Sequence, residues 1–222
     1  MNKAGNNELS QASSIAFFPS VSAEDRARAD MYALLSRLFY AAPDESLLRA
    51  LAAAAGMDAE GDDVSLATAW HELTTAAALA DVEEARFEYD ILFIGTGKAD
   101  VTLYSTAYLK GITHNGAGAE KQLAALRGEL ADIGIIRHEN VHEPEDHFSA
   151  LCDVMRFLIV GDSETPAGDV ERQREFFHSH IASWFVKLAD AIEANKNANF
   201  YRPAGRFLRA FLDLENESLK ID

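Results

Sequence analysis

The sequence contains a single cysteine, Cys152, among its 222 residues. One thiol cannot form an intramolecular disulfide or build a zinc or iron–sulfur site from several cysteines. The chain also lacks any apolar run near the roughly 20 residues that a membrane-spanning helix needs. Its N-terminal stretch, MNKAGNNELSQASSIAFFPS, has neither the charged start nor the long apolar core of a secretory signal. We therefore expect a cytoplasmic protein without stable membrane insertion.

Basic residues are scarce relative to acidic ones. The chain has 20 Lys and Arg against 36 Asp and Glu, which gives a formal net charge of −16 at pH 7. Such a chain repels phosphate backbones, so nucleic acid is excluded as a partner, and anionic membrane surfaces are disfavoured for the same reason. A basic peptide would be attracted by the same field.

Alternating strand patterns are missing, and the apolar residues recur instead at helical spacing. Ala and Leu dominate the apolar 48% of the chain, which also favours helices. The sequence therefore predicts an all-α protein, a single helical-bundle domain of about 8–10 helices. The clearest apolar stripes lie within residues 31–39, 47–51, 66–77, 87–94, 123–133, 148–159, 176–188 and 207–212.

Helix-start residues define the limits of this domain. Ser22 with Asp25 three residues later is a typical helix cap, and Asp44 directly after Pro43 is a second one. We expect the helical domain to span residues 22–217, with a mobile N-terminal tail over residues 1–21 and a C-terminal tail over residues 218–222.

Three local patterns carry more specific expectations. The stripe of Phe87, Ile91 and Ile94 predicts that these side chains belong to the core. The region from about Asp169 to Asn195 reads as one long helix. The glycines of GTGK, residues 95–98, indicate a sharp turn, because the stretch lacks the G-x-x-x-x-G-K-[ST] phosphate-binding pattern.

The stretch HENVHEPEDH supports two interpretations, of which the first is a zinc site. Its first half matches H-E-x-x-H, in which His138 and His142 would bind zinc on one helix and Glu139 would act as the base. A zinc-dependent hydrolase is therefore the alternative function. Pro144 lies too close to His142 for a helix through both histidines, and no spacing marks a third ligand. We expect no metal and no catalytic residue.

The second interpretation takes EPEDH as the start of a helix. Pro144 suits the first helical position, and Glu145 and Asp146 in the first turn face the positive end of the helix dipole. Glu143 then lies near the capping position and His147 in the first turn. On this interpretation the helix begins at Pro144, and the two preceding histidines lie in a loop.

Four segments of the chain, in order, resemble the TorD/DmsD/NarJ family of redox-enzyme maturation chaperones. The resemblance spans about residues 25–215. One departure is the absence, from KADVTLYS, of prolines that are common in the family after the Leu-Phe pair. The matching segments are RADMYALLSRLFYAAPDESLLRALAAA (the first two helices), FEYDILFIGTGKADVTLYSTAYL (the E-Y-x-x-L-F-x-G loop), EPEDHFSALCDVMRFLI (the E-P-x-D-H segment) and QREFFHSHIASWFVKLADAIEANKNANFYRPAGRFLRAFLDLE (the Q-x-x-F…H-x-x-W helix and final F-Y segment).

The resemblance implies a TorD-like, all-helical cytoplasmic chaperone that is not an enzyme and needs no cofactor of its own. Members of the family bind the twin-arginine signal peptide on the precursor of a molybdoenzyme catalytic subunit and assist its maturation before export. They occur as monomers or homodimers. A helical adaptor for some other protein surface is a further interpretation.

The resemblance and the chemistry of arginine together indicate the residues that would bind the peptide. Guanidinium groups form strong, often bidentate pairs with carboxylates, so Glu143 and Asp146 are the expected acids. His147 would orient Asp146 or form a hydrogen bond to the peptide, and Pro144 would fix where the acids point. The residues expected to make apolar contacts with the peptide are Tyr89, Leu92, Phe93 and Tyr104. For these four residues, packing in the protein core is the competing interpretation.

Overall fold

The computed structural model describes residues 21–54, 56, 64–95, 97–109, 117–136, 143–161 and 168–220. Within these ranges the chain forms ten α-helices, one short π-helix and no strand, which confirms the prediction of an all-α helical bundle. None of the described helices is both long and apolar enough to span a membrane. The elements are α1 (Ala23–Tyr40), α2 (Glu45–Ala52), α3 (Val64–Leu79), α4 (Val82–Tyr89), the π-helix η2 (Asp90–Ile94), α5 (Ser105–Leu109), α6 (Ala117–Asp132), α7 (Phe148–Val160), α8 (Val170–His180), α9 (Phe185–Glu193) and α10 (Tyr201–Ser218).

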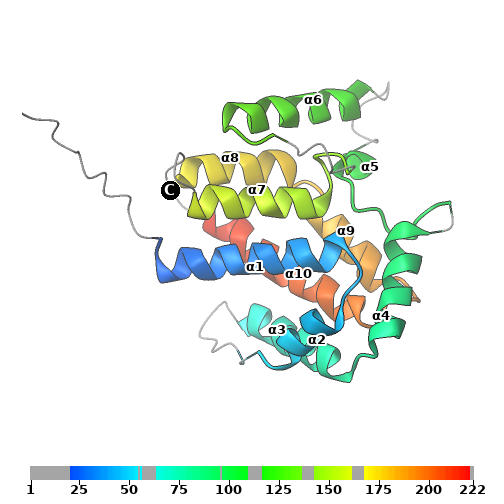
Figure 1. Ribbon diagram of the computed structural model, residues 1–222. Helices are drawn as coiled ribbons and strands as arrows, with labels where there is room; N and C mark the ends of the chain where they lie inside the picture. The colour runs from blue at the N-terminus through cyan, green and yellow to red at the C-terminus, as the bar shows by residue number, and fades with distance from the viewer. Residues whose placement is uncertain are drawn as a thin grey trace, which may run out of the picture.

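Helix α1 packs against α7 along much of its length (Figure 1). Phe39 near the end of α1 contacts Phe148 at the start of α7, so the two helices run in opposite directions. Helix α8 lies beside α7, α10 crosses behind α1, and α6 lies outside α7 and α8. Helices α3 and α9 pack on α10, and α2 packs on α3.

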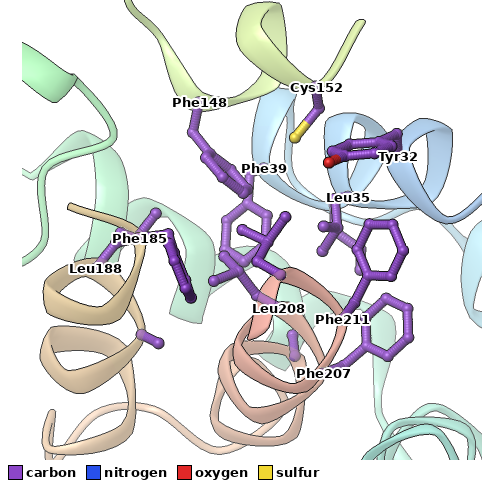
Figure 2. Packing of buried hydrophobic residues seen from close by; sticks show 14 of the residues in the cluster. Tyr32, Leu35, Phe39, Phe148, Cys152, Phe185, Leu188, Phe207, Leu208 and Phe211 are labelled. Carbon is purple, nitrogen blue, oxygen red and sulfur yellow. The ribbon is translucent and has the colours of Figure 1, made fainter. Parts of the chain in front are cut away.

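Aromatic side chains join these helices in one core (Figure 2). Phe39 lies edge-on to Phe148 of α7, at 5.4 Å between ring centroids, and to Phe93 of η2, at 5.7 Å. Tyr32 of α1 meets Phe211 of α10 in the same geometry at 4.9 Å. Such edge-to-face pairs stabilise the fold beyond the burial of their area.

A buried carboxylate holds the start of α10. Glu88 of α4 accepts hydrogen bonds from the backbone N–H groups of Asn199, Phe200 and Tyr201, at 2.8, 2.9 and 2.7 Å. No side chain adjacent in sequence caps this helix. Since a helix N-terminus favours negative charge and leaves N–H groups unsatisfied, Glu88 supplies from α4 the cap that α10 lacks.

A second buried carboxylate ties α10 to α1. Glu215 accepts hydrogen bonds from both Nε and Nη2 of Arg28, at 2.7 and 2.9 Å, and from the Tyr32 hydroxyl at 3.0 Å. Arg28 also donates to Gln173 of α8. The Arg28 guanidinium thus connects three helices through its fixed fork of donors.

Both caps expected from the sequence are confirmed. The Ser22 hydroxyl accepts from the backbone N–H of Asp25 at 2.9 Å, and Asp44 accepts from that of Leu47 at 2.7 Å. Each cap satisfies one of the four N–H groups that a helix start leaves open.

The glycine turn after η2 is also as expected. Gly95 has φ of +66°, and a Cβ at this position would overlap the backbone of Lys98. Only glycine adopts this conformation without strain. The turn lets Val101 donate its N–H back to the Leu92 carbonyl at 2.8 Å, which directs the following residues across the start of α7.

The prediction of one long helix over residues 169–195 was wrong. The structure divides it into α8 and α9, with a break at residues 181–184. The indole N–H of Trp184 donates to the His180 carbonyl at 2.6 Å. In a continuous helix the backbone N–H of Trp184 would make this bond, so the side chain replaces the backbone donor. The break turns the Trp184 ring into the core, where it is fully buried.

The expectation that Phe87 and Ile94 belong to the core was also wrong, because they are 67% and 61% exposed. The buried stripe of α4 and η2 instead runs through Ala85, Glu88, Tyr89, Leu92 and Phe93. This stripe has helical spacing but includes a charged residue. The full stripe was not predicted because the sequence alone gives no reason to bury a glutamate.

Replacing Phe39 tests the central position of this side chain. We expect Phe39→Ala to lower the free energy of unfolding by about 3–5 kcal/mol, because it leaves a cavity among buried rings. Phe87→Ala, the same change at an exposed site, should alter it by no more than about 0.5 kcal/mol. Urea denaturation followed by circular dichroism measures both. Equal effects would contradict the core assignment.

Candidate functional site

The predicted helix start at Pro144 was wrong. Helix α7 begins at Phe148, and His147 is its N-cap with extended backbone angles. Residues 144–147 form a turn that is closed by a hydrogen bond from the His147 N–H to the Pro144 carbonyl at 3.1 Å. Glu145 and Asp146 therefore precede the helix and do not lie in its first turn.

Pairing with a distant segment explains this late start. The N–H of Ser105 donates to the Asp146 carbonyl at 3.1 Å, and the N–H of Phe148 donates to the Leu103 carbonyl at 2.8 Å. Tyr104 and His147 form an isolated antiparallel bridge between these bonds. An extended backbone at residue 147 is required for this pairing and excludes a helix through it.

The Asp146 carboxylate forms its hydrogen bonds within the protein. Its side chain is buried, and Oδ2 accepts from the backbone N–H of Thr106 at 3.1 Å and from the Thr106 hydroxyl at 2.7 Å. The carboxylate therefore fixes the turn to the start of α5. It does not present its charge at the surface.

His147 is buried beside it and caps α7. Its Nδ1 accepts from the backbone N–H of Ser149 at 3.3 Å and lies 2.7 Å from the Ser149 hydroxyl, while its ring lies edge-on to Tyr104. Burial lowers the pKa of His147, although the carboxylates of Glu143 and Asp146 act in the opposite direction. The neutral ring with Nδ1 as acceptor is therefore the form that this site favours.

Glu143 lies at the other end of the turn and is held by Tyr104, whose hydroxyl donates to Oε2. Partial burial and this hydrogen bond to Glu143 raise the pKa of Tyr104 well above its ordinary value. Tyr104 therefore remains a hydrogen-bond donor near neutral pH and keeps the Glu143 carboxylate in place.

The turn forms one end of a groove of about 580 Å³ that runs between α1 and α7, with α6 at its side. Its floor is mainly apolar, and three carboxylates border it: Glu143, Glu145 and Asp153. Tyr40 at the end of α1 lies beside the turn and is 55% exposed. The remaining lining residues are Ala33, Ser36, Arg37, Leu130, Ile135, His147, Ser149, Ala150, Val154 and Phe157.

Sequence reasoning missed Asp153 as a residue of this groove. It lies on the exposed side of α7, as Arg156 does, and nothing local in the sequence marks which of the two borders a groove. Partial burial of its carboxyl raises its pKa, and a hydrogen bond from Ser36 and the charge of Arg156 offset part of this effect. Asp153 adds negative charge midway along the groove.

Three of the expected apolar contacts lie in the core. Tyr89, Leu92 and Phe93 are buried, and the Tyr89 and Phe93 rings pack on Tyr201 of α10. Core packing therefore describes these residues. Tyr104 is half-buried and does not line the groove itself, but it contacts two lining residues, Glu143 and His147.

The residues of the zinc pattern, His138, Glu139 and His142, lie outside the described residues. Across the described part of the chain, no three His, Cys, Asp or Glu side chains gather closely enough to hold a metal ion.

A larger hollow of about 1040 Å³ between α3, α9 and α10 is chemically different. Both of its arginines already pair with acids of the hollow: Arg206 with Glu72 and Glu193, and Arg209 with Asp190 and Glu193. The groove between α1 and α7 instead combines apolar surface with carboxylates at its border, so it is the stronger candidate site.

Comparison with known proteins gives consistent matches over most of the chain. Residues 59–190 match the family model described as nitrate reductase delta subunit. Three similar proteins bear the name chaperone protein TorD. The one from Vibrio parahaemolyticus is 26% identical over 72% of this chain and 77% of its own. The one from Colwellia psychrerythraea is 25% identical over 91% and 92%, and one from Vibrio cholerae is 23% identical over 86% and 91%.

The lowered pKa of His147 predicts a pH dependence of stability. A histidine whose folded-state pKa is depressed contributes its full stability above the ordinary pKa near 6.5 and loses it as the pH falls below that value. His147→Asn keeps a capping side chain but does not titrate. Between pH 7.5 and 5.5 the free energy of unfolding should therefore fall more for the wild-type chain than for this variant, as measured by urea denaturation.

The matched control is His71→Asn, at an exposed position of α3. If it flattens the pH profile as much as His147→Asn does, the assignment to His147 is wrong.

Proposed function

The chain belongs to the nitrate reductase delta subunit family, which includes the TorD-like chaperones, and we propose that it binds a twin-arginine signal peptide in the groove between α1 and α7. It is a redox-enzyme maturation chaperone and not an enzyme. The proposed guest is the signal peptide on the precursor of a molybdenum-cofactor oxidoreductase, held in the cytoplasm before export.

The composition of the groove carries this proposal. A twin-arginine signal has two adjacent guanidinium groups followed by an apolar stretch. Carboxylates at the turn suit the guanidinium groups, because Arg–carboxylate pairs are charge-assisted and often bidentate. The partly exposed apolar side chains of Ala33, Ile135 and Phe157 suit the stretch that follows, since burying that stretch removes apolar area from water.

The polarity of the groove suggests how the guest lies. Glu143 and Tyr40 are at the end near the start of α7, and Phe157 is at the other end. We place the arginine pair beside Glu143 and the apolar stretch toward Phe157. The net charge of −16 would attract the cationic end of the guest over a longer range.

In this proposal the turn residues Pro144, Asp146 and His147 act on the guest indirectly, by holding the turn in place. Asp146 holds the turn to α5, His147 caps α7, and Pro144 accepts the hydrogen bond that closes the turn. Together they fix the direction in which Glu143 and Glu145 point. A binding site is selective only when the groups that make contact are held in place by others.

Titration with synthetic peptides tests the proposal. A panel of twin-arginine signal peptides from dimethyl sulfoxide, trimethylamine oxide, nitrate and formate enzymes, each with its Lys-Lys counterpart, should contain at least one peptide that binds and prefers arginine. Glu143→Gln should weaken that binding about tenfold, the effect of losing one charged hydrogen-bond partner. Isothermal titration calorimetry measures both effects.

Glu45→Gln serves as the control, because Glu45 is an exposed acid on α2 outside the groove. Its affinity for the peptide should equal that of the wild-type chain. Negligible binding of every arginine peptide, or equal binding of each Arg-Arg and Lys-Lys pair, would refute the proposal.

Variants of Asp146 test whether its carboxylate acts on the guest through the turn or contacts the guest directly. Asp146→Ala should lower the free energy of unfolding by about 1–3 kcal/mol, because it leaves the partly buried N–H and hydroxyl of Thr106 without their acceptor. Peptide binding should weaken with it, since the turn loses its anchor. If Asp146→Asn abolishes binding while the denaturation curve stays unchanged, the carboxylate touches the guest directly.

A further inference from the structure

Arg127 of α6 contacts one of the acids at the groove. Its Nε donates to Oε2 of Glu145 at 3.0 Å. The Glu145 side chain is 12% exposed, whereas that of Arg127 is 51% exposed. A positive group from α6 thus lies at the end of the groove where the guest arginines are proposed to bind.

Helix α6 forms one wall of the groove but packs only lightly on the bundle. Leu130 and Ile135 line the groove from this side. Among the described elements the most extensive contact of α6 is with the short α5, and Figure 1 shows α6 as a separate layer outside α7 and α8. Its other polar tie in the described structure is Glu129, which lies 2.7 Å from Nε2 of His180 in α8.

We propose that Arg127 is an internal competitor for the guest's guanidinium group. Without a guest, Arg127 binds the Glu145 carboxylate and thereby holds α6 against the groove. When a guest arginine binds Glu145, it displaces the Arg127 guanidinium, and the contact between α6 and the turn is lost. This inference rests on the proposed function. It makes Glu145 a direct contact of a guest arginine and adds Arg127 as the group that the guest displaces from Glu145.

The exchange also explains how the groove would distinguish arginine from lysine. Displacing one guanidinium from a carboxylate requires an entering group that binds at least as well. A guest arginine offers a planar fork of donors, whereas a lysine offers a more strongly hydrated point charge. Lysine therefore competes poorly with Arg127, and the discrimination comes partly from the contact that must be broken.

Two variants with opposite expected effects on peptide binding test this proposal. Arg127→Gln and Glu145→Gln each remove the contact, so both should raise the rate of amide hydrogen exchange in α6 in the absence of peptide. With a twin-arginine signal peptide, Arg127→Gln should bind about two- to fivefold more tightly, which corresponds to releasing a partly exposed ion pair. Glu145→Gln should bind more weakly.

The selectivity for arginine over lysine peptides provides a second measurement. The ratio of Arg-Arg to Lys-Lys peptide affinity should fall in Arg127→Gln, because lysine no longer has to displace a guanidinium. The control is Arg49→Gln, which breaks an exposed Arg–Glu pair on α2, away from the groove. It should leave α6 exchange, affinity and selectivity as in the wild-type chain.

The outcomes separate this proposal from the one it rests on. Weaker peptide binding by Arg127→Gln, or unchanged amide exchange of α6 in both variants, refutes the proposal that Arg127 competes with the guest. Arginine-selective binding by the wild-type chain would then still support the proposed function. Absence of arginine-selective binding in the wild-type chain refutes the proposed function, and with it the exchange with a guest, even if both variants raise α6 exchange.

Discussion

The pairing of residues 103–105 with residues 146–148 is the constraint on which the groove depends. These segments lie about forty residues apart in the chain, and two backbone hydrogen bonds with one bridge join them. The buried Asp146 carboxylate adds two bonds to Thr106. Because the pairing holds residue 147 extended, α7 starts at Phe148, and the preceding turn directs Glu143 and Glu145 to the groove.

The residues before this pairing serve it indirectly. Phe93 packs on Phe39, which in turn contacts Phe148 at the start of α7. The turn at Gly95 returns the chain so that the Val101 N–H donates to the Leu92 carbonyl. The chain then leads directly into residues 103–105. Tyr89, Leu92 and Phe93 therefore support this part of the fold from the core and do not line the groove.

Acidic side chains have two separate uses in this strongly acidic chain. Glu88, Glu215 and Asp146 are buried and satisfied by N–H groups, an arginine or a threonine, and they hold helices and turns together. Glu143 and Asp153 border a groove with apolar surroundings. Burial with matched donors makes the first group structural, and partial exposure beside apolar surface makes the second suited to a cationic guest.

The sequence by itself determined what depends on near neighbours: the all-helical class, the caps at Ser22 and Asp44, the turn at Gly95 and the likeness to a chaperone family. Periodicity and capping act over a few residues, so local patterns predict them. Only the tertiary structure decided that α7 starts after Pro144, that Glu88 is buried and that Asp153 borders a groove. Each of these depends on partners far away in the chain, which no local pattern specifies.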